Sequence, residues 1–114
     1  MFRYERDDRV RVINTGTSTL AKDTLAKVGN WIGVPFEDIL PGEEGVLIVR
    51  GVFDVPVADP SVEIASGTLL QYAGDGKVKP YDSSDDTNPK IGKAFKTKAS
   101  GEETVYITLM PELY

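Results

Sequence analysis

The feature that most constrains this fold is the apolar run at residues 45–57, which reads GVLIVRGVFDVPV. A strand with one face in water alternates apolar and polar side chains, because successive residues point to opposite faces. The four residues from Val46 to Val49 offer no polar position. The run therefore predicts a strand, within Gly45–Val55, that is covered on both faces.

Two kinds of cover would satisfy such a strand. It can be central in its own domain, with the core on one face and the edge of another sheet on the other. Alternatively, a second copy of the protein covers part of its second face. A chain of 114 residues has little material with which to bury two faces, and oligomers commonly complete such cores. Both alternatives fit the sequence.

Short β-branched and aromatic segments recur along the chain, and 11 glycines and 7 prolines separate them. Asp75-Gly76 predicts a tight hairpin, because Asp-Gly supplies the positive φ of a primed turn. Residues 18–27 carry too few apolar positions for a helix and are expected to be a loop leading into a strand, with a single helical turn as the alternative. The predicted strands are Glu5–Ile13, Thr24–Val28, Trp31–Glu37, Gly45–Val55, Thr68–Tyr72, Lys77–Pro80, Lys90–Lys98 and Glu103–Met110.

This order of strands predicts an all-β protein, a small single-domain β-barrel or sandwich over residues 10–114. An extended N-terminal arm, residues 1–9, precedes it. The last strand should have one wet face, because Val105, Ile107 and Leu109 alternate with polar or amphipathic residues.

Composition excludes several classes of function. The chain has no cysteine and no histidine, which removes disulfides, thiolate chemistry, imidazole proton shuttles and the commonest metal ligand. We therefore expect no enzyme and no cofactor; an enzyme would have to rely on carboxylates such as Glu37, Asp38 or Asp54. The net charge of −5 disfavours nucleic acid as a partner. The charged N-terminus does not resemble a secretory signal and no apolar run approaches membrane-spanning length, so we expect no membrane association.

The N-terminal arm and two aromatic residues are the candidate contact sites. Phe2 and Tyr4 alternate with charged residues that include Arg3 and Arg6. The arm is either a solvated tail or a strand added to the sheet edge of a partner, which would be another protein or a neighbouring subunit.

Trp31 and Phe53 are candidates for an oligomer interface. Trp31 is the only tryptophan, and tryptophan is enriched among the residues that dominate binding energy. Packing in the core is the alternative for Trp31.

Two other segments suggest ligand chemistry only weakly. Residues 82–88 supply oxygen atoms for calcium, but they lack the glycine and the distal glutamate of an EF-hand loop. We expect a solvated loop there and no metal. Lys77 lies beside a hairpin turn, as the modified lysine of lipoyl carriers does, but the flanking motif of those carriers is absent.

Several short motifs follow one another in a fixed order over about residues 10–110. This ordered set resembles the small capsid decoration, or cement, proteins of tailed phages. The motifs are Gly29-Asn30-Trp31-Ile32-Gly33-Val34, Gly42-Glu43, Gly51-Val52-Phe53-Asp54-Val55-Pro56, Gly67-Thr68-Leu69-Leu70-Gln71-Tyr72, Ile91-Gly92-Lys93-Ala94, and Ala99-Ser100-Gly101-Glu102 with Val105–Leu109.

The resemblance implies a non-enzymatic protein that binds the outer surface of an assembled phage head and stabilises contacts between capsomers. It implies the major capsid protein as partner, a homotrimeric state, assembly in the host cytoplasm and a final location on the virion. A trimer would bind by avidity, because three linked weak contacts hold far more tightly than one. The alternative is a small β binding module, for carbohydrate or a protein partner, within a larger assembly.

Overall fold

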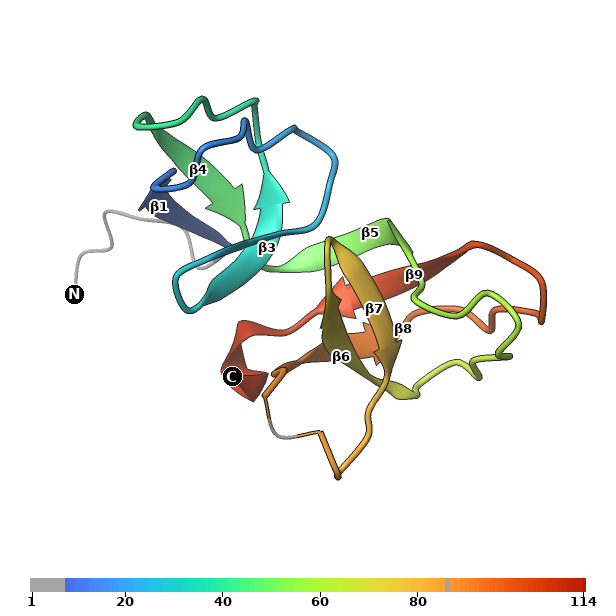
Figure 1. The fold of residues 1–114 in the computed structure, drawn as a ribbon. Helices are drawn as coiled ribbons and strands as arrows, with labels where there is room; N and C mark the ends of the chain where they lie inside the picture. The colour runs from blue at the N-terminus through green and yellow to red at the C-terminus, as the bar shows by residue number, and fades with distance from the viewer. Residues whose placement is uncertain (1–7, 86) are drawn as a thin grey trace. The chain divides into compact units, whose positions relative to one another are not determined.

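The computed structural model describes residues 8–85 and 87–114. In that part of the chain the regular structure is β-strand, with one short 3-10 helix, η1 (Pro111–Leu113), and no α-helix (Figure 1). No helix among these residues is long and apolar enough to cross a membrane. The all-β prediction is confirmed. The chain divides into two compact units, Met1–Gly51 and Val52–Tyr114.

The first unit contains a four-stranded antiparallel sheet. Its strands, in the order in which they pair, are β1 (Arg9–Ile13), β4 (Glu44–Ile48), β3 (Trp31–Pro35) and β2 (Ala26–Val28). Residues 18–25 form a loop, as expected, and an isolated bridge between Leu20 and Ile39 holds it.

One face of this sheet carries the core of the unit. Leu47 and Val49 are buried in a cluster with Val12, Ala26 and Ile39. Across the strand, Val46 and Ile48 are only half-buried. Their partners on β1 are Arg11 and Arg9, and the long stems of arginine can lie along apolar surface.

The predicted strand Gly45–Val55 is wrong as a single element. β4 ends at Ile48, and β5 (Gly51–Pro56) belongs to the other sheet. The extended run breaks at Val49 and Arg50, and Gly51, which begins β5, has a φ of 137°, a backbone conformation that side-chain-bearing residues rarely adopt. The apolar run therefore supplies one strand to each sheet: β4 is central in the first sheet, between β1 and β3, as one alternative predicted, and β5 is an edge strand of the second.

The second unit contains a five-stranded antiparallel sheet. In pairing order its strands are β5, β9 (Thr104–Leu109), β8 (Lys90–Ala94), β6 (Leu69–Gly74) and β7 (Lys77–Pro80). Of the predicted barrel or sandwich, the closed barrel is wrong: among the described residues, one isolated parallel bridge, between Val57 just after β5 and Val78 on β7, links the two edges of this sheet. Pro56 and Pro80 end these two strands and have no N–H with which to extend a ladder.

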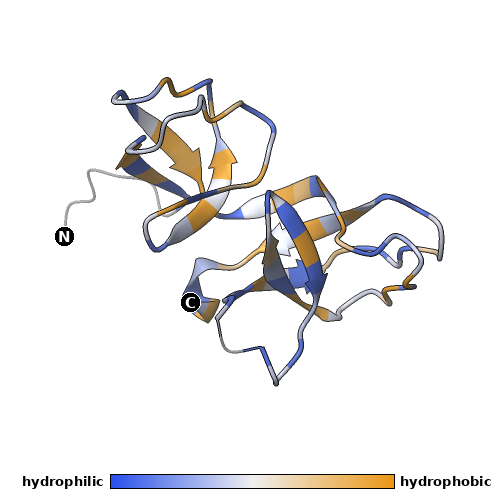
Figure 2. Cartoon of the chain, in the orientation of Figure 1, coloured by the Kyte–Doolittle hydropathy of each residue, from blue (hydrophilic) through white to orange (hydrophobic). Residues whose placement is uncertain are grey.

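In the second unit, buried and exposed side chains alternate along strands, and the buried ones form its core. Figure 2 shows hydrophobic residues recurring along these strands. On β9, Val105, Ile107 and Leu109 are buried while Thr104 and Tyr106 are exposed, as predicted. The predicted hairpin between β6 and β7 is also confirmed. Its two loop residues have positive φ, 52° at position 75 and 75° at position 76.

Candidate functional site

The predicted arm contacts Phe2, Arg3, Tyr4 and Arg6 lie outside the described residues. The described part of the chain starts at position 8, directly before β1. Both the strand-addition role of the arm and its boundary at residue 9 stay predictions.

The two predicted interface aromatics belong to different units. Trp31 is the first residue of β3 and leaves 41% of its surface exposed, so it is not a fully buried core residue. Phe53 lies on β5 and is half-buried. Their roles in an oligomer interface stay predictions.

The second unit exposes an aromatic surface that was not predicted from the sequence. Phe95 follows β8 and its N–H donates to the carbonyl of Tyr106 on β9, at 2.7 Å. The two side chains leave 54% and 43% of their surfaces exposed, and Val52 on neighbouring β5 leaves 44%. Lys96 Nζ lies 4.9 Å from the centre of the Tyr106 ring. Val52, Phe95, Lys96 and Tyr106 are called the aromatic face below.

The signal for this surface was present in the sequence. The alternation of β9 assigns Tyr106 to the wet side, and Phe95 follows the buried Ala94. Both aromatics occupy positions at which a soluble sheet usually carries polar side chains. An aromatic residue at a position that alternation assigns to the wet face of a strand is therefore the sequence signal for the aromatic face.

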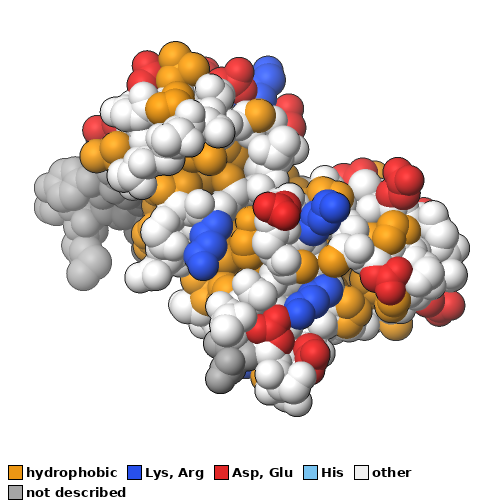
Figure 3. Space-filling view, viewed as in Figure 1, with side chains coloured by type: hydrophobic (Ala, Val, Ile, Leu, Met, Phe, Trp, Pro, Cys, Tyr) orange, Lys and Arg blue, Asp and Glu red, His pale blue; other side chains and the backbone are white. Residues whose placement is uncertain are grey.

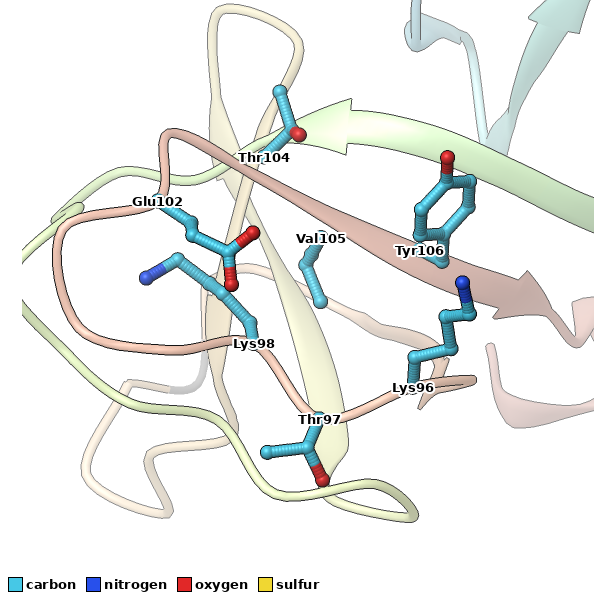
Figure 4. A pocket seen from close by; sticks show the side chains of 7 residues that line it. All are labelled: Lys96, Thr97, Lys98, Glu102, Thr104, Val105 and Tyr106. Carbon is cyan, nitrogen blue, oxygen red and sulfur yellow. The ribbon is translucent and has the colours of Figure 1, made fainter.

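A small pocket of about 160 Å³ lies beside the aromatic face (Figure 4). Ligand pockets commonly measure about 300–1,000 Å³, so this one is small for an organic ligand. Its surroundings are Lys96, Thr97, Lys98, Glu102, Thr104, Val105 and Tyr106.

The charged groups around this pocket are partly engaged in holding loops. Lys98 is only 2% exposed, and its ammonium donates to the carbonyls of Pro60, Val62 and Ala99 at 2.7–2.9 Å. Glu102 accepts a hydrogen bond from the N–H of Ala99. These two side chains fasten the loops around the pocket, and the other exposed polar residues of its lining are Lys96, Thr97, Thr104 and Tyr106.

Two further buried polar side chains hold loops in the same way. Asn14 Nδ2 donates to the carbonyls of Ser18 and Ile39, both at 2.9 Å. Gln71 is fully buried; its Nε2 donates to the carbonyls of Asp85 and Asn88, and its Oε1 accepts from the N–H of residue 82. Neither role was predicted from the sequence, because each depends on which loop covers the side chain.

The acidic loop at residues 82–88 engages its own carboxylates. Asp85 accepts hydrogen bonds from Lys79 Nζ at 2.6 Å and from the hydroxyl of Thr87. The bond from Lys79, followed by those within the loop, holds the pKa of Asp85 far below its ordinary value. Asp82 accepts from Ser84, which also lowers its pKa. Within residues 8–85 and 87–114 no group of three or more metal-ligating side chains is placed to hold an ion.

The carboxylates considered for catalysis, Glu37, Asp38 and Asp54, are all exposed. Glu37 and Asp38 belong to the first unit and Asp54 to the second. Asp38 Oδ1 accepts the N–H of Lys22 at 2.9 Å and so has a structural role.

A family model described as phage cement protein matches residues 4–109, which span most of both units. No curated protein and no solved structure matches the chain. The resemblance seen in the ordered motifs is confirmed: the chain belongs to the phage cement protein family.

Proposed function

We propose that the protein binds the outer surface of an assembled phage head, through the major capsid protein, and stabilises contacts between capsomers. Membership of the cement family supports an association with the capsid. The aromatic face carries the proposal, because it exposes two aromatic side chains, Phe95 and Tyr106, whose backbones are joined by a hydrogen bond. Phenylalanine and tyrosine are enriched where proteins bind one another.

The proposed role is structural and needs no catalysis. The absence of cysteine and histidine from the whole sequence supports this part of the proposal. The protein is assembled onto heads in the host cytoplasm and remains on the virion. No cofactor takes part.

The proposed active form is a homotrimer. A rigid trimer binds by avidity only where neighbouring capsid sites are correctly spaced, so free subunits stay off isolated sites. The exposed Trp31 is a candidate for the subunit interface, with Phe53 as a second. Sedimentation equilibrium at micromolar concentration should show three times the 12.5 kDa mass of the chain; a monomer alone would count against this part of the proposal.

Binding to heads that lack the protein tests the function directly. Threonine replaces Phe95 and Tyr106, since threonine keeps β-propensity while removing the rings. Val62→Thr is a matched control, because Val62 is an exposed apolar residue of the same unit that lies in a loop outside the aromatic face.

We expect the doubly substituted protein to melt like the wild type and to bind heads at least tenfold more weakly, since burying the remaining exposed part of two rings contributes about 1.5–3 kcal/mol. Wild-type binding by this variant would remove the aromatic face from the proposal. Failure of the wild-type protein to bind heads would refute the function itself.

Carbohydrate binding is less well supported by the same surface. Sugars stack on the open faces of aromatic rings. Lys96 Nζ lies over the Tyr106 ring and covers one such face. This arrangement suits an interface with protein carboxylates better than a sugar platform.

A further inference from the structure

The first unit displays two aliphatic side chains beside a turn that many hydrogen bonds hold in place. Ile13, the last residue of β1, leaves 54% of its surface exposed, and Leu40 leaves 51%. Pro41 next to Leu40 is also exposed. Ile13, Leu40 and Pro41 are called the apolar tip. Figure 3 shows hydrophobic side chains, with acidic ones beside them, at the top of the first unit.

The turn under the tip is closed in two ways. The N–H of Glu43 donates to the carbonyl of Leu40 at 3.0 Å, and Glu43 Oε1 accepts the N–H of Leu40 at 3.1 Å. Pro41 and Gly42 take the two central positions, and Gly42 has a φ of 84°, as a type II turn requires. The backbone at Leu40 is therefore fixed before any partner arrives.

Asn14 joins this turn to the end of β1. Its N–H donates to the carbonyl of Glu43 at 2.9 Å, and its carbonyl accepts the N–H of Gly42 at 2.7 Å. Its buried side chain also donates to the carbonyl of Ile39, the residue before Leu40. Ile13 directly precedes Asn14 and pairs with Glu44. The two exposed aliphatic residues are thus held on one small framework.

An apolar group displayed on a fixed turn is costly in water and favourable in a binding site. Because the backbone at Leu40 is already ordered, a partner that binds this residue avoids the entropic cost of ordering that backbone. Acidic residues also adjoin the tip in the sequence: Glu37, Asp38, Glu43 and Glu44 are all exposed, and Figure 3 shows acidic side chains outnumbering basic ones at the top of this unit. A partner that covers the tip must offer an apolar recess and positive groups around it.

We propose that the apolar tip is a second capsid contact, which inserts into an apolar recess bordered by lysine or arginine on the shell. This inference rests on the proposed function and adds a partner chemistry to it. Each subunit then holds the head through both of its units, by the aromatic face of the second and by the tip of the first. Two linked contacts per subunit strengthen attachment without new contact area at either site.

The first test compares wild-type protein with the Ile13→Thr/Leu40→Ser variant on heads that lack the protein. Both side chains are more than half exposed, so melting should be unchanged, and Val62→Thr serves again as control. We expect the variant to bind about 10- to 100-fold more weakly, from the loss of two half-buried aliphatic contacts. Wild-type affinity of the variant would overturn the inference while leaving the proposed function intact.

The second test addresses the charge of the recess with the Glu37→Gln/Glu44→Gln variant. Glu43 is left unchanged, because its carboxylate holds Leu40. At low salt the variant should bind heads more weakly than the wild type does. At high salt the two should bind equally, since salt screens exposed charges. Tighter or unchanged binding at low salt would overturn the basic recess. Loss of self-association by the Ile13→Thr/Leu40→Ser variant in solution would show a second copy as the occupant and would overturn the capsid contact.

Discussion

Replacing Gln71 by methionine should release the loop at residues 82–88 from the second sheet. Methionine has nearly the shape of glutamine but cannot make its hydrogen bonds. In the folded protein, Gln71 makes three hydrogen bonds to the loop backbone, at 2.9, 2.7 and 3.1 Å. It is fully buried, so the substitution changes these bonds with little change of volume.

The magnitude follows from the number of bonds. Each intramolecular hydrogen bond contributes about 0.5–1.5 kcal/mol net, so three give about 1.5–4.5 kcal/mol. Loop groups that regain water reduce the loss, and the more apolar methionine offsets part of it, which places the expected destabilisation at about 2–3 kcal/mol. For a chain of this size that lowers the melting temperature by roughly 10 °C.

Urea unfolding followed by circular dichroism measures the loss, and amide hydrogen exchange locates it. Leu70→Met is the matched control, because Leu70 is equally buried on the same strand and its side chain makes no hydrogen bond. We expect faster exchange at residues 82–88 in Gln71→Met alone. Equal stability and equal exchange in the two variants would refute the idea that Gln71 anchors the loop.

Three further predictions concern pH, metals and the arm. The lowered pKa of Asp85, caused first by Lys79, means that its ionised form stabilises the fold above the ordinary pKa of 3.8. That contribution is lost as the pH falls below 3.8 toward the lower folded-state value, so melting temperature should drop between about pH 5 and pH 2, and less steeply in Asp85→Asn. Melting and head binding should be unchanged by EDTA or by reductants; a loss in EDTA would show a metal in the acidic loop. A chain starting at Asp8 should melt like the full chain but fail to bind heads, because buried aromatics at positions 2 and 4 would each contribute about 1.5–3 kcal/mol; unchanged binding would make the arm an ordinary tail, and loss of trimers would place it on a neighbouring subunit.

Most strands could be predicted because their signals are local. Turn residues such as Asp75-Gly76 and the two-residue alternation of β9 depend only on neighbours in the chain. The error at Gly45–Val55 has a local cause as well. Val49 and Val52 look alike in sequence, but Val49 is buried in the first core and Val52 is exposed on the second sheet. Hydropathy does not report the break at Arg50 and the unusual backbone conformation of Gly51 that separate them.

The buried polar residues show why the candidate surfaces were harder to predict than the strands. On β6, Leu70, Gln71 and Tyr72 are all buried, although alternation assigns Gln71 to a wet face. Gln71 is buried because a loop more than ten positions later in the chain folds over it and accepts its hydrogen bonds. On β9, no described loop covers the equivalent wet side at Tyr106, which stays 43% exposed. Alternation therefore predicts which face a side chain takes, whereas distant segments decide whether that face stays open to a partner. Here the positions left open carry phenylalanine and tyrosine, and that choice is the reason to look for the capsid contact there.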